Sequence, residues 1–144
     1  MHGRIFVVSR NKNDECLFDD DILADLMPIA DWVSESDDII ETDLNWLKHD
    51  YGDIEVGDKC FNLSLGSITK LRTELASERK KAINDLLADD DATINWWRIA
   101  DIAWPETELS ICIESDGPMH FEQFLMECAQ PGTYHVLKVF DYHY

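Results

Sequence analysis

Carboxylates are the side chains in this sequence whose number and spacing could do chemistry. Sixteen Asp and Glu residues lie between Asp14 and Asp58, with Lys48 as the only Lys or Arg among them, which gives this acidic segment a net charge of −15. Carboxylates bind metal cations, act as general acids or bases, or pair with Arg and Lys of another protein. The residues that we expect to contact such a partner are Asp14, Glu15, Asp19, Asp20, Asp21, Asp25, Asp31, Glu35, Asp37, Asp38, Glu41 and Asp43.

Charge density decides whether these acids could imitate a nucleic acid. The chain has 144 residues, 30 acids against 12 Lys and Arg, and a net charge of −18. Its folded surface, about 7,600 Å² by area scaling, offers about 420 Å² per net charge, whereas duplex DNA offers about 100 Å². If the acidic segment covers about a third of the surface, its density rises to about one charge per 170 Å². The segment, and not the total, therefore approaches DNA.

Other chemistries have less support. Asp19–Asp21 with Asp25 could hold Mg²⁺ or Ca²⁺, but the spacing of an EF-hand loop is absent, and helix capping accounts for the run. The four cysteines are too far apart for a zinc motif and predict reduced thiols in a cytoplasmic protein. The sequence contains no GxSxG, P-loop or dinucleotide fingerprint. We expect no catalytic residue, no metal site and no cofactor.

The charge and the apolar runs also bear on partners. A strongly negative protein is repelled by nucleic acids and anionic membranes, so we expect neither as a direct partner. Met1–Arg10 is too short for a signal peptide, and no stretch approaches the ~20 apolar residues of a membrane span. The oligomeric state is left open.

The elements that must position these acids belong to one α+β domain covering residues 1–144. Five tryptophans and 45% hydrophobic residues indicate a sizeable core. The order β-α-α-β-β-α-?-β-α-β predicts a small mixed sheet with helices packed on it. The expected elements are a central strand at Arg4–Ser9, helices at Asp19–Met27, Glu41–Tyr51 and Ser67–Leu87, a hairpin from Ile54–Val56 and Lys59–Leu65 around Gly57-Asp58, a strand at Glu108–Glu114, a helix at Met119–Ala129 and a strand at Tyr134–Tyr142.

Some details follow from local patterns. Ser67 is the expected N-cap of its helix, whose apolar stripe comprises Ile68, Leu71, Leu75, Ala82, Ile83 and Leu86. Its five basic residues are expected on the other faces, where they could touch nucleic acid or neutralise part of the acidic segment. Alternation predicts that the strand 108–114 is half-exposed. Cys128 is expected on the apolar face of the following helix. The closing strand–helix–strand unit would be a right-handed crossover if its strands were parallel. The range 31–38, partly helical in one interpretation, and the range 93–104, helix or strand, stay ambiguous.

These patterns favour an acidic inhibitor that blocks a basic nucleic-acid-binding surface. In composition the chain resembles the DNA-mimicking proteins that phages and mobile elements use against restriction and CRISPR systems. The expected partner is a basic protein, a nuclease or a nucleic-acid-binding effector complex. One alternative is an immunity protein that neutralises a basic toxin nuclease. Another is a small carboxylate-based or metal-dependent enzyme, which would need converging acids in a pocket and a carboxylate with a perturbed pKa.

Overall fold

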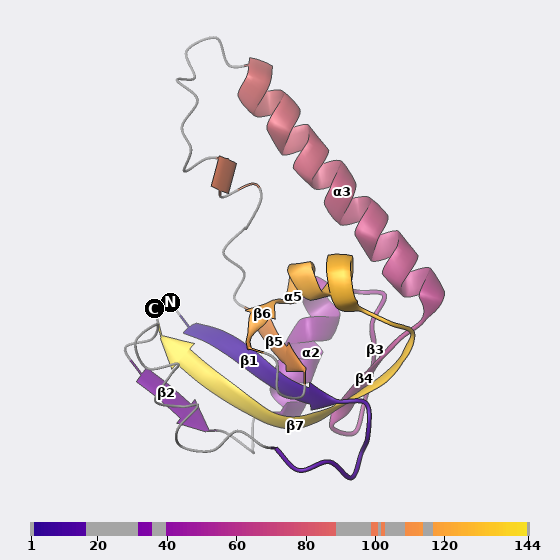
Figure 1. Cartoon of the computed structure of the whole chain (residues 1–144), viewed down its shortest axis with the longest axis vertical. Coiled ribbons are helices and arrows are strands. Elements are labelled where there is room, and N and C mark those ends of the chain that lie inside the picture. Colours follow the sequence, from indigo (N-terminus) through magenta and orange to yellow (C-terminus); the bar gives the residue numbers. More distant parts are fainter. Residues whose placement is uncertain are drawn as a thin grey trace.

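A mixed β-sheet with helices packed on it forms the structure, as the sequence predicts. The computed structural model describes residues 2–16, 32–35, 40–88, 99–100, 102, 109–113 and 117–143. Within them, six strands follow the order β3-β4-β7-β1-β5-β6, and a seventh, β2, also pairs with β7. The long strand β7 (Gly132–His143) runs antiparallel to β1 (His2–Ser9), and His2 lies opposite His143. The two ends of the chain are therefore neighbours (Figure 1).

The strand β1 is central, as its run of β-branched and apolar residues predicts. It has β7 on one side and the parallel strand β5 (Leu109–Ile113) on the other. Both of its faces are covered, because the consecutive residues Ile5 to Val8 are all buried. The strand β6 (Met119–His120) pairs with β5 at one edge of the sheet.

The expected hairpin forms the other edge, from β3 (Glu55–Gly57) and β4 (Cys60–Leu63). The turn lies one residue later than predicted, since Gly57 still pairs with Cys60 and Lys59 takes a positive φ of 48°. Strand β4 also pairs with β7 in the antiparallel direction, and there Phe61 stacks on Tyr134 with ring centroids 5.2 Å apart.

Three helical segments share one hydrophobic core with the sheet. They are α2 (Ile40–Asp50), α3 (Leu65–Ala88) and a short α-helix, α5 (Phe121–Gln123), that continues into a π-helical turn, η2 (Phe124–Cys128). The core contains the alternate residues Phe6 and Val8 of β1. From the helices, it contains Leu44 and Leu47 of α2, Ile68, Leu71 and Leu75 of α3, and Phe121, Phe124 and Leu125.

Helix α3 begins three residues earlier than expected, and only its first half packs on the core. Ser64 is the N-cap in place of Ser67, because the Ser64 Oγ accepts the backbone N–H of Ser67 at 2.9 Å. Beyond Leu75 the stripe leaves the core, because Ala82 and Leu86 are only half-buried and Ile83 is 46% exposed; Leu87, outside the stripe, is 72% exposed. Figure 1 shows this half of α3 rising away from the sheet.

Two expected elements differ in burial or in extent. Strand β5 is not half-exposed, because Ser110 and Cys112 are buried together with Leu109 and Ile111. Strict alternation failed here since β5 lies inside the sheet and both its faces are covered. The helix predicted from Met119 begins at Phe121, and its π turn, closed by Ala129 N–H to Phe124 O at 2.8 Å, leaves Cys128 exposed.

The remaining outcomes concern β2, the closing unit and the described range. The partial helix considered for 31–38 is wrong at 32–35, where β2 (Trp32–Glu35) pairs with the last four residues of β7, and the rest of that range lies outside the described residues. Strands β5 and β7 flank β1 in opposite directions, so the condition for a right-handed crossover is not met. The expectation for Asp19–Met27 lies outside the described residues, and in the range 93–104 only residues 99–100 and 102 are described, all of them helical.

Candidate functional site

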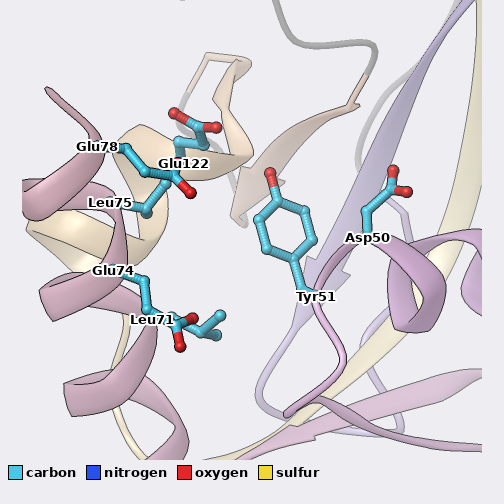
Figure 2. Close-up of a pocket in the computed structure, with 7 residues that line it drawn as sticks. All are labelled: Asp50, Tyr51, Leu71, Glu74, Leu75, Glu78 and Glu122. Atoms are coloured by element: carbon cyan, nitrogen blue, oxygen red, sulfur yellow. The ribbon is translucent and has the colours of Figure 1, made fainter. Parts of the chain in front are cut away.

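A cleft with acidic walls lies where the end of α2, one face of α3 and the start of α5 meet. Its volume is about 270 Å³. Figure 2 shows Tyr51 between Asp50 on one side and the α3 residues with Glu122 on the other. The lining residues are Asp50, Tyr51, Leu71, Glu74, Leu75, Glu78 and Glu122.

The periodicity of α3 explains its contribution. Residues 71, 74, 75 and 78 recur at helical spacing and therefore lie on one face. Leu71 and Leu75 are buried and form an apolar floor, whereas Glu74 and Glu78 are exposed at the rim. Leu71 and Leu75 thus belong to the core, and Glu74 and Glu78 are the charges that α3 contributes to the cleft.

The end of α2 supplies the opposite wall. The N–H of Tyr51 donates to Leu47 O at 2.9 Å, and Ile54 N–H donates to Tyr51 O at 2.9 Å, so a tight turn follows the helix. The Tyr51 ring packs against Phe121, with centroids 4.9 Å apart. Because Phe121 is buried in the core, this contact fixes the ring beside the floor.

Two arginines of α3 hold the third wall of the cleft, which α5 and η2 form, in place. Arg72 donates from Nε to Leu125 O at 2.6 Å and from Nη2 to Ala129 O at 3.2 Å. These are carbonyls at the end of η2, which the helix itself leaves without partners. Two turns after Arg72, Arg79 Nη2 lies 3.5 Å from the Glu122 carboxylate. Both guanidinium groups therefore face the protein, contrary to the expectation that they ride on the outer faces.

The electrostatics of the cleft disfavour negative charge. Burial, and then the neighbouring Glu122, Asp50 and Glu78, raise the pKa of the Tyr51 hydroxyl, so it stays neutral. Burial also raises the pKa of the Glu122 carboxyl, although Arg79 opposes that shift. Lys70 lies 3.9 Å from Glu74 but is held more closely by Asp53, at 2.6 Å.

Such an arrangement suits a cationic group that carries an apolar stem. Four carboxylates and a neutral phenol offer hydrogen-bond acceptors, and the leucines offer an apolar surface. Within the described residues, no group of three or more His, Cys, Asp or Glu is placed to hold a metal ion. The cleft also lacks His and Cys, so its acids are the groups available for proton transfer.

The residues expected to bind a partner are only partly described. Asp14, Glu15 and Glu41 are exposed, although the Asp14 carboxylate accepts hydrogen bonds from Ser9 Oγ and from Asn11 Nδ2. Asp43 is 3% exposed and accepts a hydrogen bond from Arg4 Nε at 3.2 Å, so its carboxylate serves the fold and is withdrawn from the expected surface. Glu35 lies in β2, where only the backbone is described. Outside the described residues lie Asp19, Asp20, Asp21, Asp25, Asp31, Asp37 and Asp38.

The sequence patterns did not identify the acids of the cleft as a site. Glu74 and Glu78 stand four apart beside Leu71 and Leu75, a signal that read as ordinary intrahelical pairing. Nothing in the local sequence distinguishes Glu122, because its position depends on a contact with a helix more than 40 residues earlier.

Comparison with protein families, with curated proteins and with solved structures found no match to this chain. Among the described residues, no helix combines the length and the apolar character that a membrane crossing requires.

Proposed function

We propose that this protein is an acidic inhibitor that binds a basic protein surface where a nucleic acid would otherwise lie. One observation carries the proposal: a long stretch of the sequence is rich in acids and contains no Lys or Arg. Residues 17–39 alone carry eight acids and no Lys or Arg. This stretch is therefore the part of the sequence that we expect to face a basic partner.

The use of the cations supports the same proposal. All four described arginines have guanidinium contacts within the protein: Arg4 with Asp43, Arg72 with two carbonyls and Arg79 with Glu122. Arg10 binds the carbonyls of Gln130 and Pro131 and lies over the Tyr134 ring. Arg10 also fits closely against Gly132, whose φ is +128° and where a Cβ would come within 2.5 Å of the guanidinium. These contacts of the four guanidinium groups stabilise the fold.

The binding mode follows from charge-assisted pairing. Carboxylates of the acidic segment would occupy the places of phosphates against Arg and Lys of the partner. Opposite charges would steer the encounter, so association is expected to be fast at low ionic strength and to weaken steeply with salt. A protein that acts in this way works in the cytoplasm, where nucleic-acid-binding effectors operate.

The experiment is a competition assay after the partner has been identified by co-purification from the native host. A labelled nucleic acid is bound to the partner, and this protein is titrated in at two salt concentrations. Displacement that weakens at high salt supports the proposal; binding without displacement, or binding that salt does not change, refutes it. The triple variants compared are D19K/D20K/D21K, among the residues expected to contact the partner, and, as a control with the same charge change, E55K/D58K/E127K at exposed described positions that are not among those residues. Only the first should abolish displacement.

The identity of the partner separates two versions of this function. A defence effector such as a restriction or CRISPR complex would make the protein an anti-defence inhibitor. A toxin nuclease encoded beside it would make it an immunity protein, with the same physics of binding.

A second candidate, carboxylate-based hydrolysis, is favoured by the cleft. An enzyme of this kind needs several acids in one pocket and a carboxyl with a perturbed pKa, and the cleft has both, since the pKa of Glu122 is raised. A panel of chromogenic glycosides and esters would test it, with E122Q and E78Q as the variants and E55Q as the control. Turnover that both cleft variants abolish and E55Q preserves would establish the enzyme; turnover that is absent, or equal in all variants, would eliminate it.

A further inference from the structure

We infer that the cleft between α2, α3 and α5 is a docking pocket for one arginine side chain of the partner protein. This inference rests on the proposed function and names a contact within it. The residues that line the pocket all come from the range 50–122, outside the acid-rich stretch 17–39 of the sequence, so the pocket would add a shaped contact to a diffuse electrostatic one.

The shape of the cleft fits a long side chain with an apolar stem. Leu71 and Leu75 provide a floor on which methylene groups can lie, and the Tyr51 ring forms a wall. The volume of about 270 Å³ lies at the lower end of small-molecule pockets. It therefore suits a single inserted side chain better than a larger ligand.

The acceptors around the floor match a charged head group. Glu78 makes no ion pair with any described residue, and Glu74 has only the distant contact with Lys70. The Tyr51 hydroxyl forms no hydrogen bond with a described residue, and its neutral state leaves it both a donor and an acceptor. A cation entering the cleft would thus meet acceptors that the fold has not already used.

These features favour arginine over lysine. A guanidinium is planar and weakly hydrated, stacks on aromatic faces and presents five donors in a fork that fits carboxylates. An ammonium is a compact, strongly hydrated charge that gains less from an apolar floor and an aromatic wall. Inserted arginines of this kind are common among the residues that dominate interface energetics.

The test is a titration followed by NMR, with N-acetyl-arginine amide as the probe. Its neutral analogue N-acetyl-citrulline amide and the lysine equivalent serve as comparison ligands. Saturable shifts of the Leu71 and Leu75 methyl signals and of the Tyr51 ring are expected with the arginine probe. Citrulline should produce no saturable shift, and lysine should bind more weakly. Shifts that do not saturate, or that citrulline produces equally, overturn the inference.

A matched pair of double variants locates the site. E74Q/E78Q removes two charges from the rim, whereas E55Q/D58Q removes two from the exposed hairpin β3-β4. The rim variant should weaken the arginine probe about threefold to tenfold, because each partly exposed pair contributes modestly. The hairpin variant should change it less than about twofold. Equal losses in both variants would mean a long-range charge effect and would overturn the pocket.

The failure of this inference can be told apart from failure of the proposed function. If the probe does not bind the cleft while D19K/D20K/D21K still abolishes displacement of nucleic acid, the inhibitor stands without an arginine pocket. If the probe binds but no nucleic-acid-binding partner is displaced, the cleft takes arginine for another purpose and the inhibitor proposal is wrong.

Discussion

The hydrogen bonds from Arg72 of α3 to η2 offer the most direct test of how the cleft is held together. Replacing Arg72 by Met keeps a stem of similar length but removes two hydrogen bonds, those at 2.6 Å and 3.2 Å to the carbonyls of Leu125 and Ala129. A hydrogen bond from a charged donor contributes about 1.5–3 kcal/mol. Because Arg72 is only half-buried, water can replace part of this. We therefore expect R72M to lower the free energy of unfolding by about 2–3 kcal/mol in total.

Urea unfolding followed by far-UV circular dichroism at 25 °C would measure the change. A loss of this size is a large part of the 5–15 kcal/mol that typically stabilises a domain, so the midpoint should move clearly. In a thermal scan it corresponds to a fall in Tm of about 6–12 °C for a chain of this length. The m-value should be unchanged, because the same surface is exposed on unfolding.

Two further variants show whether the fork geometry is responsible. K80M removes an exposed cation from the same helix and should change stability by less than about 0.5 kcal/mol. R72K keeps the charge without the fork and should recover no more than about half of the loss. If R72M and K80M unfold at the same urea concentration, the two carbonyl contacts do not hold η2 and the reasoning is wrong.

Three other outcomes test the structure more briefly. S64A should cost about 1 kcal/mol of stability and S67A clearly less, because Ser64 caps α3; equal losses in urea unfolding would restore Ser67 as the cap. L75A should cost about 2–4 kcal/mol and L87A less than about 0.5, since they are 8% and 72% exposed; a comparable cost for L87A would mean that the outer half of α3 is packed in solution. For Glu122, whose pKa is raised by burial, the protonated form is favoured by folding. Wild-type stability relative to E122Q should therefore be highest below the pKa of an unfolded Glu and fall as the pH rises through the folded pKa. A difference that grows with pH, measured by urea unfolding at several pH values, would reverse that sign.

Local pattern was sufficient for most of the elements. The apolar run at β1, the helical spacing of Leu44 and Leu47, and the Gly57-Asp58 turn signal each identify an element that the structure contains. Errors arose where burial or a terminus was inferred from alternation alone. Ser110 is buried although it alternates with apolar residues, and Ser64 displaces Ser67 by one turn as the cap. A side chain's exposure depends on which strands and helices lie beside it, and alternation cannot supply that.

The sequence by itself determined the net charge, the α+β class and the position of the acid-rich stretch along the chain, because these depend on residue types and short spacings. Only the tertiary structure decided which charges remain for a partner. Folding buries Asp43 against Arg4, and it brings Glu122 beside α3 to complete a cleft whose other residues come from two helices. These are contacts between residues 39 or more positions apart, and no local pattern encodes them. The described acidic residues are therefore of two kinds: those that the fold uses, such as Asp43, and those that it leaves available, such as Glu78.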